Sequence, residues 1–182
     1  REACRQLQTW ADAGLDVVPM AVNISAVEFR NNRFVDGVTL ILQETGIAPQ
    51  FLELELSENV LMRNADASVE RLNKLRCLGL SLTIDAFGSG YSSLSYLQRF
   101  PVSTLKIDPS FVNHIDTNPD DATIVGTIIA MGRNLKQQVI AEGVETGEQF
   151  SVLQAQHCDE GQGFHFSPPL PAEAFGRLLQ AA

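Results

Sequence analysis

Short apolar runs recur along the chain, and each ends in a polar residue before a helix-like stretch begins. These runs are rich in β-branched residues, so they predict six strands, at 16–25, 51–58, 80–87, 103–110, 138–145 and, with the weakest pattern, 157–167. Strands that alternate with helices predict βαβ units and a parallel sheet.

Several of the intervening segments carry recognisable helix signals. Residues 66–77 have apolar side chains at helical spacing. Asn118 is suited to cap a later helix that begins at Pro119. Thr146 and Gln149 have the spacing of a capping box at the start of the next one.

The fold class follows from where the polar residues lie. No GxGxxG motif or P-loop follows the first predicted strand, whereas almost every strand ends in a polar residue. In a barrel all strand C-termini meet at one mouth, so we expect an α/β fold of the (β/α)8 TIM-like type. The chain supplies about six strands and opens as if in mid-helix, so we expect 1–182 to be the later part of a longer barrel domain.

Composition narrows the class of protein. A chain of 182 residues that is 45% hydrophobic can form one packed domain. No apolar run is long enough to span a membrane, and three scattered cysteines indicate neither zinc nor disulfides, so a cytoplasmic setting is expected. A net charge of −9 argues against duplex nucleic acid as a partner, but it allows a small anion held by a metal.

The polar residues at the strand ends form a distinctive set: Asn23, Glu55, Glu58, Asp85, Lys106, Asp108, Glu142, Glu145 and Gln162. Carboxylate and amide oxygens gathered in one mouth suit Mg²⁺ or Mn²⁺. A lysine beside them suits a phosphate oxygen or an attacking water. Metal and phosphate together indicate phosphoester hydrolysis.

Each of these residues also has a purely structural interpretation. Asn23 and Glu58 could cap the helices that follow them. Lys106 could be a salt-bridge partner inside the barrel, and either Glu142 or Glu145 could be structural. The recurrence of polar residues at equivalent places on successive strands favours a shared site.

Six motifs in order resemble one family. The segments "AVNISA", "LELELSE", "TIDAFGSGYSSLSYL", "LKIDPSFV", "VIAEGVET" and "DEGQGFHFSPPLP" are similar to those of the EAL domain family of cyclic di-GMP phosphodiesterases. The resemblance implies a modified (β/α)8 barrel. It also implies hydrolysis of cyclic di-GMP to the linear dinucleotide pGpG, with Mg²⁺ or Mn²⁺ as cofactor.

The resemblance also implies roles for the residues at the mouth. Asn23, Glu55 and Asp85 would be metal ligands. Catalysis would fall to Lys106, which orients water or a phosphate oxygen, and to Glu142 and Asp85.

Further roles and partners follow from the same resemblance. Glu58 would steady the loop after the Asp85 strand, Gln162 and Glu145 would lie near the substrate, and Asp108 would support the site from behind. Flanking sensor or GGDEF-type domains are expected in the full protein, which those parts could anchor to a membrane. A homodimer through residues 92–100 is expected as well.

Three departures from the family pattern bear on activity. The Glu-Ala-Leu signature, which supplies a metal ligand, does not occur in residues 1–182. Ala86 follows Asp85 where the family has a second aspartate, and Pro168 stands where a basic residue is common. Because the signature glutamate is missing and alanine neither ligates a metal nor accepts a proton, we expect hydrolysis to be weak or absent, with at least about 10²–10⁴-fold lost through Ala86.

Two other functions remain open at this point. The chain could be a degenerate receptor that binds cyclic di-GMP without cleaving it, or an unrelated metal-dependent barrel enzyme. A six-strand sheet also leaves two unpaired edges, so we expect residues 1–182 alone to be poorly soluble or marginally stable.

Overall fold

The computed structural model describes residues 1–90 and 94–181. Its strands are β1 (Met20–Asn23), β2 (Leu52–Ser57), β3 (Ser81–Phe87), β4 (Thr104–Ile107), β5 (Gln138–Glu142) and β6 (Glu160–Gln162). Its helices are α1 (Glu2–Asp12), α2 (Ala26–Arg30), α3 (Phe34–Thr45), the 3₁₀ turn η1 (Pro49–Phe51), α4 (Glu58–Met62), α5 (Ala65–Cys77), α6 (Leu94–Leu97), α7 (Pro109–Val112), α8 (Pro119–Leu135), α9 (Gly147–Ala155) and α10 (Ala172–Ala181).

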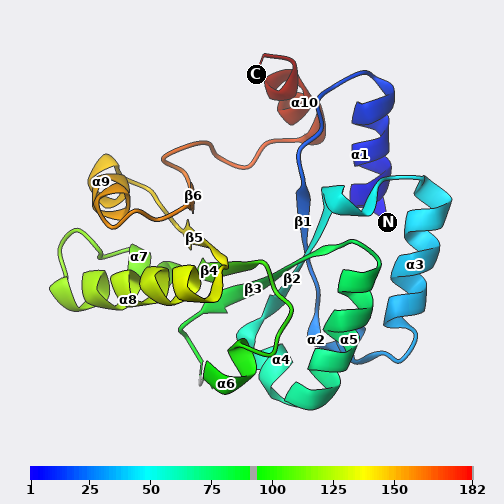
Figure 1. Cartoon of the computed structure of the whole chain (residues 1–182). Coiled ribbons are helices and arrows are strands. Elements are labelled where there is room, and N and C mark those ends of the chain that lie inside the picture. Colours follow the sequence, from blue (N-terminus) through cyan, green and yellow to red (C-terminus); the bar gives the residue numbers. More distant parts are fainter. Residues whose placement is uncertain (91–93, 182) are drawn as a thin grey trace.

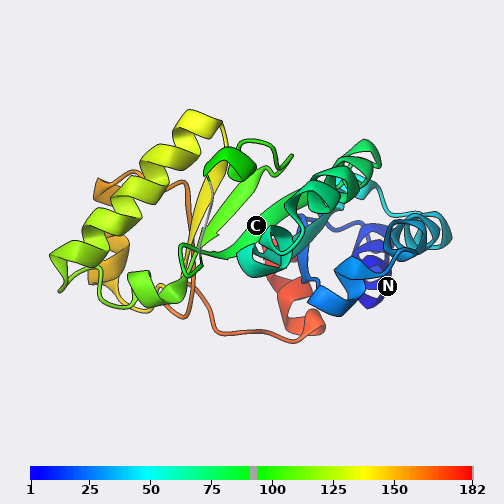
Figure 2. The same cartoon turned by 90° about the horizontal axis from the view of Figure 1, so that it is seen from below.

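The six strands form one parallel sheet in the order β1-β2-β3-β4-β5-β6. All six predicted strands are confirmed, each within its expected range but shorter. The sheet curves, and its larger helices lie on the outer side (Figures 1 and 2). The predicted TIM-like architecture is thus present as a half-barrel of six strands.

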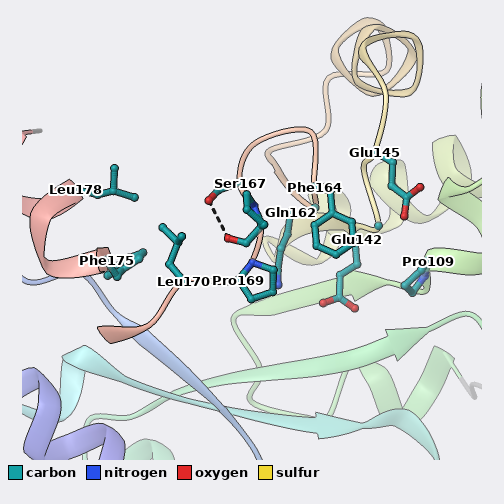
Figure 3. A pocket seen from close by; sticks show the side chains of 13 residues that line it. Pro109, Glu142, Glu145, Gln162, Phe164, Ser167, Pro169, Leu170, Phe175 and Leu178 are labelled. Carbon is teal, nitrogen blue, oxygen red and sulfur yellow. Dashed lines mark hydrogen bonds between the residues drawn. The ribbon is translucent and has the colours of Figure 1, made fainter. Parts of the chain in front are cut away.

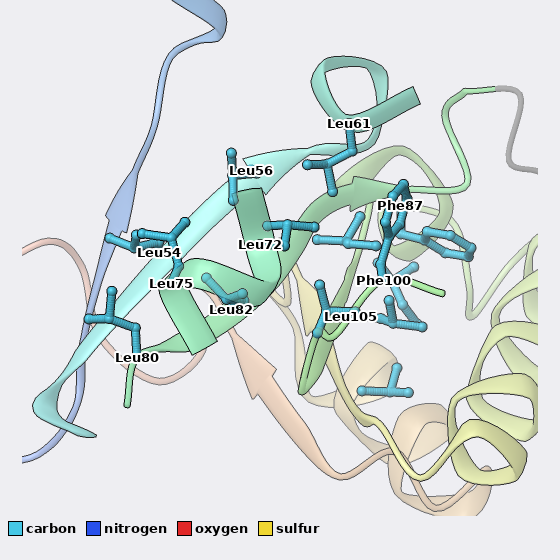
Figure 4. Close-up of a cluster of buried hydrophobic side chains, with 14 of the residues drawn as sticks. Leu54, Leu56, Leu61, Leu72, Leu75, Leu80, Leu82, Phe87, Phe100 and Leu105 are labelled. Carbon is cyan, nitrogen blue, oxygen red and sulfur yellow. The ribbon is translucent and has the colours of Figure 1, made fainter. Parts of the chain in front are cut away.

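The outer face of the sheet supplies the hydrophobic core. In β2, Leu54 and Leu56 are buried, and Leu82 on β3 lies beside them (Figure 4). Leu72 and Leu75 of α5 pack against these strands and are fully buried. Because side chains alternate along a strand, burying these leucines turns the intervening residues to the opposite face.

That opposite face, here called the inner face, is polar. It carries Asn23 and Glu55, which are paired in register on β1 and β2. Glu55 is in turn opposite Thr83 of β3, while Lys106 and Glu142 come from β4 and β5. The alternation places polar groups of five successive strands on one side of the sheet.

The helix boundaries follow the expected caps. Asn118 accepts a hydrogen bond from the Asp120 N–H, and α8 begins at Pro119. Thr146 and Gln149 form the predicted capping box of α9. None of the described helices has both the length and the apolar character that crossing a membrane would need.

Candidate functional site

The site centres on a lysine held between two carboxylates. Lys106 Nζ lies 2.7 Å from Glu55 Oε1 and 2.5 Å from Glu142 Oε1. The residue is only 4% exposed, so its charge is largely removed from water. The structure therefore shows the salt-bridge arrangement of Lys106 that the sequence left open, and it places that salt bridge at the mouth.

The burial of these groups changes their protonation. Burial lowers the pKa of Lys106, but hydrogen bonds to Glu142 and Glu55 outweigh it, so the pKa lies above its ordinary value. Burial raises the pKa of Glu142, Lys106 opposes that rise, and the carboxyl of Asp85 adds to it. Asp85 and Glu142 are therefore close enough to interact as like charges.

Asp85 lies near the C-terminal end of β3, where the pairing with β4 is irregular. The register shifts between Ile84 and Phe87, so the strand bulges at Asp85 and Ala86. Asp85 Oδ1 accepts a hydrogen bond of 2.8 Å from the Ala86 N–H. Ala86 itself has a φ of 52°, in the left-handed region that alanine rarely adopts.

Asn23 is exposed on the inner face at the end of β1, beside Glu55 in register. It does not cap the helix that follows. Ser25 takes that role, forming a capping box with Glu28 at the start of α2. Asn23 is therefore exposed at the end of β1 without a capping role.

Glu58 connects the end of β2 to the loop after β3. Its Oε2 accepts a hydrogen bond of 3.2 Å from the Gly88 N–H, and the residue is buried. A Cβ on Gly90 would lie only 2.9 Å from Glu58 Oε1, so the loop passes directly over this carboxylate.

Asp108, by contrast, caps α7 by accepting a hydrogen bond from the Ser110 N–H.

A cavity of about 500 Å³ adjoins the lysine centre. Glu142, Glu145 and Gln162 line it from the ends of β5 and β6 (Figure 3). The far wall, with Leu170 and Phe175, was not among the sequence candidates. The signal that could have indicated this wall is the proline-rich turn at 168–171, which ends the last predicted strand segment.

The side chains at the mouth suit a hard divalent cation in their chemistry, because they are carboxylate and amide oxygens. Asp85 and Glu142 interact as like charges, which a cation would relieve. Within residues 1–90 and 94–181, however, no three His, Cys, Asp or Glu side chains gather closely enough to hold a metal ion. The Lys106 ammonium instead pairs with Glu55 and Glu142.

The chain has well-defined relatives. It is 45% identical over 172 residues to MucR of Pseudomonas aeruginosa, a bifunctional diguanylate cyclase/cyclic di-GMP phosphodiesterase, across 94% of this chain and 25% of MucR. The chain thus spans about a quarter of the length of the curated relatives it matches. The manganese/cy-diGMP complex of Klebsiella pneumoniae BlrP1 has a TM-score of 0.81 at 30% identity, over 91% of this chain and 43% of that one.

The strongest structural evidence comes from the c-di-GMP complex of the PaMucR phosphodiesterase. It superposes with a TM-score of 0.92 at 45% identity, covering 96% of this chain and 70% of that chain. The family model of the EAL domain matches residues 1–169. With its sequence, strand order and inner polar face all in agreement, the chain belongs to the EAL domain family.

Proposed function

We propose that this chain is the site-bearing part of a cyclic di-GMP phosphodiesterase domain and that Ala86 weakens its hydrolysis. The observation that carries the proposal is the grouping of Glu55, Lys106 and Glu142 beside a cavity of about 500 Å³. Its support from relatives is the ligand in the PaMucR complex. In the whole protein, flanking sensor or GGDEF-type domains would regulate this part.

The residues at the mouth would have two kinds of role, metal binding and contact with the phosphate or the attacking water. Asn23, Glu55 and Asp85 would hold Mg²⁺ or Mn²⁺, which when bound would neutralise phosphate charge and polarise the phosphodiester. Lys106 would donate a hydrogen bond to a phosphate oxygen or to the attacking water, and Glu142 would accept one from that water.

Substrate contacts extend from this centre along the cavity. Glu145 and Gln162 are both exposed and line the cavity, so they can reach a bound nucleotide. Glu58 would keep the loop after β3 in place through the Gly88 N–H. A homodimer through residues 92–100 remains a proposal, because residues 92 and 93 lie outside the described residues.

The proposed weakness of hydrolysis rests on the residue beside Asp85. Alanine offers no proton acceptor, and the loss of acid–base assistance costs about 10²–10⁴-fold in rate. Binding uses groups spread over the mouth, so we expect it to persist.

The test is calorimetric titration of cyclic di-GMP into the whole protein that carries this chain, with Mg²⁺, Mn²⁺, Ca²⁺ or no metal, and with pGpG followed by chromatography in the same samples. We expect metal-dependent binding with little pGpG. Ala86→Asp should raise turnover by at least about 10²-fold. Ala86→Asn is the matched control, because it has the same shape but accepts no proton, and it should stay slow.

One other function is supported by the same residue. A receptor that binds cyclic di-GMP without cleaving it also fits the Asp85-Ala86 pair. Binding with no pGpG from either the natural chain or Ala86→Asp would establish the receptor. Rapid pGpG production with Ala86 in place would show that the missing carboxylate matters little. No binding with any metal would exclude both functions.

A further inference from the structure

The last helix is attached to the first by an aromatic pair. The rings of Trp10 on α1 and Phe175 on α10 have centroids 5.5 Å apart at an interplanar angle of 34°. Trp10 is 7% exposed, so the contact is a buried one. Figures 1 and 2 show α10 beside α1, far from the strand β6 that precedes it in the sequence.

The contact is close as well as apolar. Gly176 is buried, and a Cβ placed on it would lie 3.1 Å from Trp10 Nε1. That is tighter than most real Cβ contacts, so a larger residue at this position would push α10 away from Trp10. The position of α10 is therefore fixed at Trp10 by the neighbouring residues Phe175 and Gly176.

The chain between β6 and α10, residues 163–171, is here called the strap. It crosses from the end of β6 to α10, and its Ser167 and Leu170 line the cavity beside Glu142 (Figure 3). Leu170 and Phe175 also line a second cavity, of about 670 Å³, which Trp10 lines as well. Phe175 thus stands between Trp10 and the cavity of the candidate site.

The first part of the strap is attached to α9, because the rings of His165 and Phe166 each have their centroid 5.4 Å from that of Phe150. A backbone hydrogen bond of 3.0 Å also joins the strap to the segment after β5, from the His165 N–H to the Val144 carbonyl. The N–H groups of Phe166 and Ser167 bond within the strap, to the Gly163 carbonyl. Its first part is therefore held by β6 and α9, whereas its second part, residues 168–171, is held at its far end by α10.

We propose that Trp10 is a positioning residue for the site: by holding Phe175 and Gly176 it fixes α10, and through α10 it fixes the strap that forms one wall of the cavity. The binding part of this inference rests on the proposed function. Trp10 touches no reacting group, so its effect on ligand affinity passes through the strap.

Two variants perturb the contact from opposite sides. Trp10→Ala removes the ring, and Gly176→Val adds bulk against it. Gln180→Ala, at an exposed position of α10, is the matched control. Two quantities are measured: hydrogen exchange of the Ser167 and Phe175 amides, which bond to the Gly163 and Pro171 carbonyls of the strap, and the Kd for cyclic di-GMP with Mn²⁺.

Both variants should accelerate exchange at these two amides by at least about tenfold and weaken the Kd by a similar factor. Amides of β2, β3 and β4 should keep their exchange rates, and Gln180→Ala should change nothing. Trp10→Phe retains an aromatic ring, so its exchange rates and Kd should stay close to those of the natural chain.

Three results would overturn the proposal: unchanged exchange in the strap, equal acceleration throughout the sheet, or faster strap exchange with an unchanged Kd. The exchange measurement needs no ligand. If the natural chain binds no cyclic di-GMP, the proposed function fails, and exchange alone decides whether Trp10 holds the strap.

Discussion

At the scale of single residues, Lys106 dominates the electrostatics of the site. Its ammonium neutralises Glu55 and Glu142, and all three side chains are largely removed from water. Lys106→Met leaves Glu55 and Glu142 unpaired, so we expect it to lower the free energy of unfolding by about 3–5 kcal/mol. Urea denaturation monitored by circular dichroism measures this change.

A surface ion pair provides the control for that measurement. Lys74 and Glu70 form an exposed i,i+4 pair on α5, so Lys74→Met should leave the unfolding midpoint nearly unchanged. Adding Glu55→Gln and Glu142→Gln to Lys106→Met should recover much of the lost stability, because the unpaired charges are then gone. Equal effects of the Lys74 and Lys106 substitutions would contradict the buried salt bridge.

Ala86 gives a prediction of the opposite sign. A left-handed conformation costs a residue with a Cβ about 1–2 kcal/mol, and glycine adopts it freely. Ala86→Gly should therefore raise the free energy of unfolding by about 1 kcal/mol. Differential scanning calorimetry would detect this as a higher Tm.

Glycine substitutions at two other positions serve as controls for Ala86→Gly. Lys136 ends α8 with a φ of 58°, so Lys136→Gly should stabilise the protein in the same way. Ala21 lies in regular β1, where glycine costs backbone entropy, so Ala21→Gly should destabilise it. If Ala86→Gly lowers the Tm as Ala21→Gly does, Ala86 does not have the left-handed conformation.

The candidate residues could be predicted because parallel strands end at a common edge. The sequence placed Glu55, Asp85, Lys106 and Glu142 there, and the structure brings their side chains together. The sequence could not choose between the salt bridge of Lys106 and a free ammonium. That outcome depends on distances between strands that are far apart along the chain.

At the scale of elements, α8 packs on the sheet through a glycine. A Cβ built on Gly132 would overlap Val139 Cγ2 on β5, so Gly132→Ala should force the helix outward and cost about 1–3 kcal/mol. A Cβ built on Gly126 of the same helix would lie 3.4 Å from its nearest neighbour, Gln156 Oε1, which is ordinary van der Waals contact. Gly126→Ala should instead gain about 0.5–1 kcal/mol from helix propensity.

Chemical denaturation of the two variants side by side provides the test. They add the same methyl group to the same helix, so only the packing against β5 distinguishes them. Changes of the same sign would show that α8 does not approach the sheet as closely as the structure has it.

Element boundaries were more predictable than element docking. Caps such as Asn118 and Thr146 are local signals, and both lie where the sequence placed them. The strands were found in the right places but shorter, because apolar patterning continues into the flanking loops. The docking of α10 on Trp10 left no local signal, since the two residues in contact are separated by almost the whole chain.

At the scale of the whole molecule, the sheet has two ends. In the part of the chain that the structure describes, β1 and β6 each pair with a single neighbour. Unpaired strand edges offer N–H and C=O groups to other chains, so we expect residues 1–182 to self-associate at micromolar concentration. Sedimentation velocity over a concentration series measures this association.

The edge can be tested against an equally apolar surface elsewhere. Val18 is 44% exposed just before β1, while Val27 is 76% exposed on the helix α2 and not in a strand. A lysine near a strand edge opposes pairing with another chain, so Val18→Lys should reduce association clearly more than Val27→Lys does. Equal reductions would mean that general surface hydrophobicity drives association. A sharp, reversible melt of a monomer in the natural chain would show that the half-barrel is stable with its edges open.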